Sequence, residues 1–269
     1  MSDLTPSPAM RHKVPRSSRN HSLTQLRSVA AVNGIKWIID AFELFTRSAG
    51  TWILIALFLG FMFYAWILLT FFSMLLGLST PLSIAGSIIT SILIGGLMLG
   101  CNTQRQDHAL TFSHLFAGFD RHGGALSAVG LFYWLGTVAI FLTVFSIVIQ
   151  TGHGQVPALA AGGDVNPLAH MQTEFLSTLL LALAATIPML MAACLAPALV
   201  VLGHRTAFQA MGLSFKACLV NILPILLWAV VTLVLLLIGL MTLGIALIVI
   251  GPVLLISMFT AYQDIFSSP

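Results

Sequence analysis

The sequence predicts an all-α, polytopic membrane protein with six transmembrane helices in three hairpins, each hairpin preceded by an amphipathic interfacial helix. Three observations lead to this fold class. Of the 269 residues, 58% are hydrophobic and only 7% are charged, whereas a soluble domain has roughly a quarter of its residues charged. Long apolar stretches alternate with short polar ones, and the basic residues fall in only every second polar stretch. A surface with so few charges must lie mostly in lipid.

The first polar stretch is a tail rich in Ser, Pro, Arg and His. It has no apolar core, so it is not a cleavable signal peptide. Too polar to bury a core, residues 1–29 are predicted to form a disordered, basic cytoplasmic tail. Its charges would keep it in the cytoplasm or, alternatively, contact anionic lipid. Residues 30–266 are predicted to form a single six-span transmembrane domain.

Three polar segments have the periodicity of an amphipathic helix. In residues 30–48, apolar residues occupy one face and polar residues recur every three or four positions on the other, at Asn33, Lys36, Asp40, Glu43 and Arg47. Phe112, Leu115, Phe116 and Phe119 repeat the pattern within residues 102–124, and residues 203–219 form a third such segment. Helices of this kind are expected to lie in the membrane interface.

Six apolar stretches are predicted to cross the membrane. The first four are residues 51–78, 82–101, 125–150 and 175–202. Residues 220–262 are too long for one crossing of about 20 residues, so they are predicted to form two spans with a turn at 239–244. Between the third and fourth spans, residues 151–174 contain several Gly and Pro and no Lys or Arg. These residues are predicted to form an irregular outside loop.

The basic residues define the predicted topology. With six spans, every Lys and Arg falls on one side of the membrane, from Arg11 through Arg47, then Arg105, Arg121, Arg205 and Lys216. The positive-inside rule therefore places both termini in the cytoplasm. Cys101, Cys194 and Cys218 lie near that reducing side or within a span, so no disulfide is expected.

The same order of elements occurs three times. An interfacial helix precedes a two-span hairpin in residues 30–101, 108–202 and 206–262, which we interpret as three repeat-like units. Few residues are identical between the units, so the repeat rests on the pattern alone. A pseudo-threefold arrangement is compatible with it.

The last third of the chain resembles a known family. The residues concerned are Ala210-Met211, Ser214 to Cys218, Asn221, Pro224, Tyr262 and Asp264-Ile265-Phe266. They resemble a proteobacterial family of six-span inner-membrane proteins without an assigned function. The wider layout is distantly similar to the membrane domain associated with glycerophosphodiester phosphodiesterases. The resemblance implies a bacterial inner membrane and no activity, because this sequence has no counterpart of the phosphodiesterase catalytic domain.

Within the spans, Pro and Gly are the candidate site residues. Pro188, Pro197 and Pro252 would kink their helices and could line a cavity of the broken-helix type. Alternatively, they are ordinary kinks whose backbone groups neighbouring helices satisfy. Gly96 and Gly100 form a small-xxx-small pair that predicts close helix packing. No ionisable residue occupies the centre of a span, which argues against an ion-coupled pump.

One polar cluster could bind a metal or act in catalysis. It consists of Asp107, His108, His114, Asp120 and His122. Because the spacing matches no standard ligand motif, a solvated loop is the favoured interpretation, and no catalytic, cofactor or metal residue is predicted. Asn221, at the start of the fifth span, is predicted to cap that helix.

These observations favour a non-enzymatic membrane protein that acts in assembly or interaction, or in envelope or lipid homeostasis. The alternative is a carrier or channel for a neutral or amphiphilic solute. A metal-dependent enzyme at the cytoplasmic interface is a third hypothesis. The expected partners are the lipid bilayer and further copies or other membrane proteins. No cofactor and no nucleic acid are expected.

Overall fold

The computed structural model describes residues 26–160 and 167–266. Within these ranges the regular elements are helices, without a strand. Six helices are long and apolar enough to cross a membrane, which confirms the predicted all-α polytopic fold. In chain order, the elements are α1 (Asn33–Arg47), α2 (Ala49–Leu75), α3 (Ser79–Arg105), η1 (Phe112–Phe116), α4 (Ala117–Ala160), α5 (Pro167–Cys194), α6 (Ala196–Val201), α7 (Ala207–Val220), α8 (Ile222–Met241) and α9 (Leu247–Phe266).

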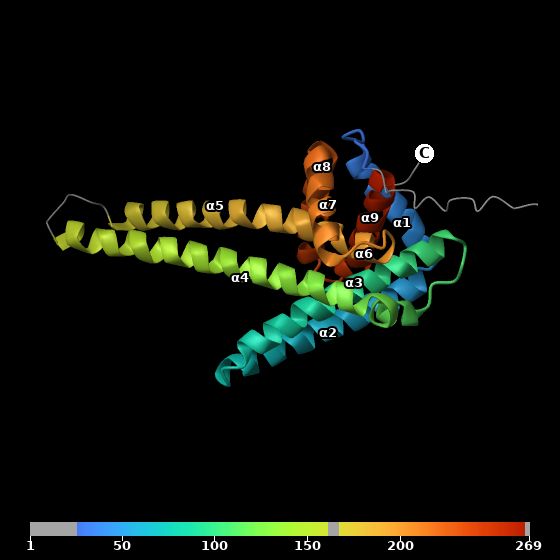
Figure 1. Cartoon of the computed structure of the whole chain (residues 1–269), viewed down its shortest axis with the longest axis horizontal. Helices are drawn as coiled ribbons and strands as arrows, with labels where there is room; N and C mark the ends of the chain where they lie inside the picture. The colour runs from blue at the N-terminus through green and yellow to red at the C-terminus, as the bar shows by residue number, and fades with distance from the viewer. Residues whose placement is uncertain (1–25, 161–166, 267–269) are drawn as a thin grey trace, which may run out of the picture.

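The hairpins extend from a common cluster. In Figure 1, the α4–α5 pair runs to the left and the α2–α3 pair runs to the lower left, while α1, α6 and α9 gather where these pairs meet. Helix α3 packs closely along α4, and α1 packs against α9 and α8. The hairpins are therefore joined at one end, and the α2–α3 and α4–α5 pairs separate toward the other.

Two tight turns close hairpins at their outer ends. Gly77 adopts a φ of 70° between α2 and α3, and Gly244 a φ of 86° between α8 and α9, a region that glycine enters without steric cost. The second turn, residues 242–246, overlaps the end of the predicted 239–244 segment. There the Thr242 hydroxyl accepts a hydrogen bond from the Ala246 amide at 3.1 Å.

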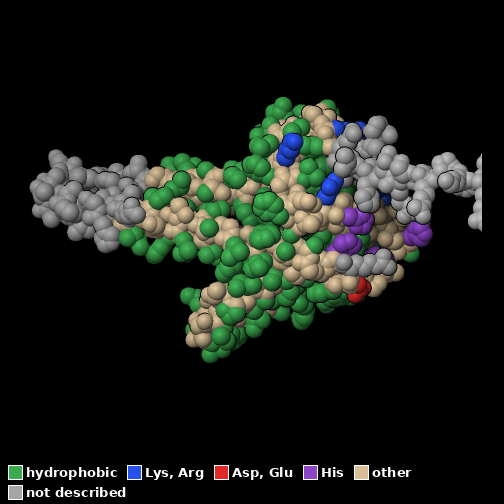
Figure 2. Space-filling model, viewed as in Figure 1, with side chains coloured by type: hydrophobic (Ala, Val, Ile, Leu, Met, Phe, Trp, Pro, Cys, Tyr) green, Lys and Arg blue, Asp and Glu red, His purple; other side chains and the backbone are tan. Residues whose placement is uncertain are grey.

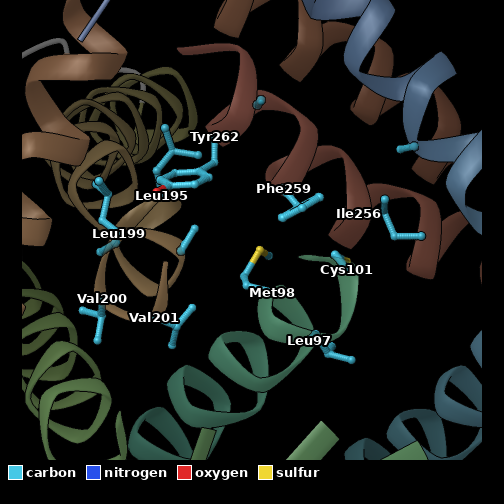
Figure 3. Packing of buried hydrophobic residues seen from close by; sticks show 14 of the residues in the cluster. Leu97, Met98, Cys101, Leu195, Leu199, Val200, Val201, Ile256, Phe259 and Tyr262 are labelled. Atoms are coloured by element: carbon cyan, nitrogen blue, oxygen red, sulfur yellow. The ribbon is translucent and has the colours of Figure 1, made fainter. Parts of the chain in front are cut away.

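Buried apolar side chains form one core where the joined ends meet. Figure 3 shows Met98 of α3 between Leu199 of α6 and Phe259 of α9. Trp37, Trp52 and Phe259 are the largest side chains that are fully buried. By contrast, large apolar residues along the outer halves of the spans are exposed, as expected for surfaces that face lipid.

The structure corrects the predicted outside loop at residues 151–174. Helix α4 continues to Ala160 and α5 begins at Pro167, so residues 151–160 and 167–174 of the predicted loop are helical. The Gly and Pro residues that predicted a loop are tolerated in helices of membrane proteins, where neighbouring groups can satisfy the freed backbone.

The fourth predicted span is broken rather than continuous. Helix α5 ends at Cys194 and α6 begins at Ala196, with Pro197 in the first turn of α6, where a missing amide costs no hydrogen bond. Pro188 and Pro252 lie inside α5 and α9. The second interfacial segment is a short 3₁₀ turn, η1, that leads directly into α4.

Residues 26–29 require a second correction. They fall at the end of the predicted disordered tail, whose first 25 residues lie outside the described ranges. The Arg27 amide donates to the Ile265 carbonyl at 3.1 Å, and Leu26 and Val29 pack against the core. The end of the tail is therefore held against α9, which extends the folded domain toward the N-terminus.

Candidate functional site

The described charged side chains lie at one end of the molecule. Figure 2 shows Lys, Arg and His near α1, α6 and α9, while the hairpin arms are largely apolar on this face. We call this the charged end, and its described charged residues are Arg27, Lys36, Asp40, Glu43, Arg47, Arg105, Asp107, Asp120, Arg205, Lys216 and Asp264. Three arrangements there join segments that are far apart in sequence: a carboxylate cluster, an amide bridge and a bridged helix break.

Asp264, near the end of α9, is the centre of the carboxylate cluster. Its carboxylate accepts hydrogen bonds from Asn33 Nδ2 at 2.6 Å, from Trp37 Nε1 at 2.9 Å and from Arg27 at 2.8 Å. Thr260, one turn earlier, donates to the Trp37 carbonyl at 2.8 Å. A charged acceptor with several donors is a strong arrangement, so this cluster fixes α1 and the preceding segment on α9.

Asn221 forms the amide bridge, although it was predicted to cap α8. It occupies the N-cap position of α8, but its side chain makes no capping hydrogen bond. Instead, Asn221 Oδ1 accepts from the Val29 amide at 2.8 Å, and Nδ2 donates to the Arg27 carbonyl at 3.0 Å. This segment outside the helices offers both a donor and an acceptor, and the amide side chain satisfies both. Asn221 therefore holds residues 27–29 against the start of α8.

Ser214 of α7 closes the break between α5 and α6. Its hydroxyl donates to the Met191 carbonyl at 2.7 Å and accepts from the Leu195 amide at 3.0 Å. A helix break leaves backbone groups of this kind without intrahelical partners. Here one buried hydroxyl provides a hydrogen-bond partner for both groups. Nearby, burial raises the pKa of the Cys218 thiol to about 11, which keeps it protonated and poorly nucleophilic at neutral pH.

Close backbone contacts accompany these polar contacts. A Cβ added at Gly34 of α1 would overlap the Pro224 carbonyl oxygen and lie 2.9 Å from the Trp228 amide nitrogen of α8. A Cβ at Gly96 would lie 2.6 Å from the Leu115 carbonyl oxygen, and one at Gly100 would lie 2.9 Å from Leu110. The charged end thus contains helix crossings that only glycine fits without a shift.

Two hollows open at the charged end. The first hollow, of about 380 Å³, lies between α1, the end of α3 and the end of α9; Arg27, Lys36, Asp40, Glu43, Leu44, Arg47, Arg105, Phe259, Thr260, Gln263 and Asp264 line it. The second hollow, of about 420 Å³, is lined by Leu99, Asn102, Ala117, Asp120, His122, Val201, Leu202 and His204. Both volumes lie in the range of small-ligand sites.

The structure separates the predicted His and Asp cluster. Asp120 and His122 line the second hollow, where the His122 ring lies 5.9 Å from the ring of His204. His114 instead closes a capping box with Thr111, and Asp107 lies 3.6 Å from Arg47. Across the described ranges, no group of three or more His, Cys, Asp or Glu residues could hold a metal ion. Sequence reasoning missed His204, whose only signal was a Gly-His turn after an apolar helix.

The predicted proline sites do not meet at either of these hollows. Pro188, Pro197 and Pro252 are absent from the residues that line the first and second hollows. A small apolar gap of about 10 Å³ beside Trp37, Cys194 and Trp228 lies near the α5–α6 break, which leaves no room for a solute.

No family model, curated protein or solved structure matches the chain.

Proposed function

We propose that this multi-pass membrane protein acts by interaction rather than by catalysis, in an assembly or envelope role. The observation that supports the proposal is that the spans are buried at their joined ends and exposed in their outer halves. Their joined ends share one core, while their outer halves expose large side chains such as Phe63, at 68%, and Phe141, at 65%. Lipid alone can cover such surfaces, but separated hairpins also offer faces to other membrane helices, which associate by close packing.

We further propose that the protein resides in a bacterial inner membrane with both termini in the cytoplasm. The gathering of Lys and Arg at the charged end supports this orientation. The resemblance of the last third of the chain to a proteobacterial inner-membrane family supports the location. The residues of that resemblance include Ser214, Asn221 and Asp264, all of which make contacts that hold the fold together.

A carrier function is the second candidate, and the break between α5 and α6 is the observation that favours it. In transporters, broken helices offer unsatisfied backbone groups to a substrate. Here Ser214 already bonds the Leu195 amide and the Met191 carbonyl. These two groups are therefore not free to bind a solute, and we rank this candidate below interaction.

Site-specific photo-crosslinking in intact cells tests the interaction role. A photoreactive amino acid replaces Phe63 in α2 or Phe141 in α4, and replaces the fully buried Phe259 of α9 as the matched control. We expect discrete protein adducts from Phe63 or Phe141 and none from Phe259. Adducts with lipid alone at both exposed positions would contradict the proposal.

Cysteine labelling tests the orientation and the carrier alternative together. In a background without the native cysteines, single cysteines are labelled from outside the cell with a polar, impermeant reagent. We expect labelling at positions 79 and 163 only, and none at 17, 113, 206 or 268. External labelling at the latter four would overturn the orientation. Labelling along α5 around Pro188 would reveal a water path and place the carrier function first.

A further inference from the structure

We propose that the first hollow binds the headgroup of a phospholipid that carries both a phosphodiester and a primary ammonium group. The inference does not depend on the interaction role proposed above. It rests on three features of the described residues: the unpaired charges of the hollow, their arrangement around α1, and the position of the hollow beside lipid-facing side chains.

The lining contains charges that the fold does not use. Arg27 is bound to Asp264, and Arg47 lies 3.0 Å from Glu43. In contrast, Lys36 and Arg105 form no ion pair or hydrogen bond within the described ranges, and neither does Asp40. Two free cations suit the oxygens of a phosphodiester, and a free carboxylate suits an ammonium group. A single ligand with a phosphodiester and an ammonium group would pair with Lys36, Arg105 and Asp40.

Gln263 adds an acceptor to the same lining. Its side-chain oxygen is buried and has no donor among the described residues. A buried acceptor without a donor costs free energy. Rotation of this amide toward the hollow would offer its oxygen to a ligand N–H, which is the donor that an ammonium group supplies.

The residues of α1 form three adjacent stripes. Lys36, Asp40, Glu43 and Arg47 make the polar stripe that lines the hollow. Ile35, Ile39 and Phe42 each precede a residue of the polar stripe by one position and are exposed. Trp37, Ala41 and Leu44 each follow by one position and are buried. Since one residue corresponds to a rotation of about 100°, the polar stripe lies between an apolar exposed face and the core.

This geometry favours a lipid headgroup over a soluble phosphate. An amphipathic helix with an exposed apolar stripe lies in the interface with that stripe among the acyl chains. The neighbouring polar stripe is then at the depth of the headgroups. A lipid whose chains lie beside Ile39 and Phe42 can place its headgroup in the hollow without leaving the bilayer. A soluble phosphate would gain no such apolar contact.

Native mass spectrometry of the full-length protein in detergent provides the test, with phosphatidylethanolamine and phosphatidylglycerol as the probes. We expect wild-type protein to bind phosphatidylethanolamine more tightly than phosphatidylglycerol. The double variant Lys36→Gln/Arg105→Gln should lose about tenfold in affinity for both lipids. Asp40→Asn should lose the preference and still bind phosphatidylglycerol. Lys216→Gln, an exposed cation at the charged end that does not line the hollow, is the matched control and should behave as wild type.

Three results would overturn the proposal. The first is equal binding of the two lipids by wild-type protein. The second is unchanged binding in the double variant, or an equal loss in Lys216→Gln. The third is displacement of the lipid by millimolar soluble phosphoethanolamine, which would assign the site to a free phosphate. Asp40→Asn is scored as a ratio of two lipids on one sample, so it remains decisive if the double variant fails to fold.

Discussion

The charged end and the outer ends of the hairpins use their polar side chains differently. At the charged end, Asp264 bonds to Arg27, Asn33 and Trp37, which lie more than 220 positions away in the sequence. In the outer halves, hydroxyls such as those of Thr70 and Thr143 donate to the carbonyl four residues earlier in the same helix, both at 2.8 Å. The Asp264 hydrogen bonds therefore join segments that are distant in the sequence. The threonine hydrogen bonds stay within one helix and do not connect helices to each other.

This difference indicates where the tertiary structure is specified. Apolar contacts between helices in lipid are weakly selective because lipid tails are as apolar as the side chains. Directional hydrogen bonds and close backbone crossings must then select the packing. Most of both lie at the charged end. The exceptions between α4 and α3 are the Trp134–Ser83 hydrogen bond at 2.9 Å and the close approach of Gly130 to the Ser87 backbone. We therefore expect substitutions at the charged end to have large effects and those in the outer halves to have small ones.

Asp264→Ala should have the largest effect. It removes the acceptor of three donors, two of which are part-buried, and each unsatisfied group costs about 1–3 kcal/mol. We expect a loss of about 3 kcal/mol, measured by reversible unfolding in mixed micelles. Glu43→Ala is the control, since its exposed pair with Arg47 contributes about 0.5 kcal/mol or less. An equal loss of unfolding free energy in the two variants would show that the carboxylate cluster has no special role in stability.

Gly96→Ala should have the next largest effect. The new methyl group would lie 2.6 Å from the Leu115 carbonyl oxygen and 2.7 Å from that of His114, and backbone there cannot move aside without repacking. Overpacking of this kind costs about 1–3 kcal/mol. Gly60→Ala, near the middle of α2 with nothing within 4 Å, should instead stabilise by about 0.5–1 kcal/mol. The same unfolding assay compares them, and a stable Gly96→Ala variant would contradict the close crossing.

Ser214→Ala should have a smaller effect of about 1–2 kcal/mol, because it leaves the Leu195 amide without its partner. The Met191 carbonyl would keep only the weak contact with the Cys218 thiol at 3.5 Å. Thr70→Ala is the control, since its hydroxyl bonds only within its own helix and its loss should change little. If α5–α6 became continuous without the bridge, hydrogen exchange at Leu195 would slow in Ser214→Ala. Faster exchange is the expected result.

The sequence predicted the helices of this fold better than their junctions. Periodicity and apolar length predicted α1 and the six spans, because both signals are local, but they did not predict the break between α5 and α6. The bonds of Asp264 and Asn221 depend on segments more than 190 positions apart, and no local pattern encodes such a pairing. Asn221 is an example of a contact that a local sequence pattern could not predict. Its position before a helix predicted a cap, but its side chain bonds instead to the backbone of Val29 and Arg27.

The hollows were also outside the reach of sequence reasoning. Lys36 and Asp40 are four positions apart on α1, a spacing that favours an ion pair on a helix surface, but no such pair forms in the described structure. Arg105 approaches this stripe only because the end of α3 packs beside α1 and α9. The second hollow likewise brings together His122 of α4 and His204 of the α6–α7 connection, which are far apart in the sequence.

Leu243→Gly should have the smallest effect, and with the opposite sign. Leu243 sits in the α8–α9 turn with a φ of 56° and a side chain that is 94% exposed. A left-handed conformation costs a non-glycine residue about 1 kcal/mol, and so exposed a side chain returns little packing. We expect a gain of up to about 1 kcal/mol in the unfolding assay.

Met241→Gly is the control. Met241 lies two residues earlier, at the end of α8, and is 86% exposed. This variant should lose about 1 kcal/mol, because glycine there weakens the helix. Opposite signs would show that backbone conformation alone sets the outer turn. A loss of stability in both variants would mean that the Leu243 side chain makes a stabilising contact in the membrane. The stability of the outer ends would then depend on the surrounding membrane more than that of the charged end does.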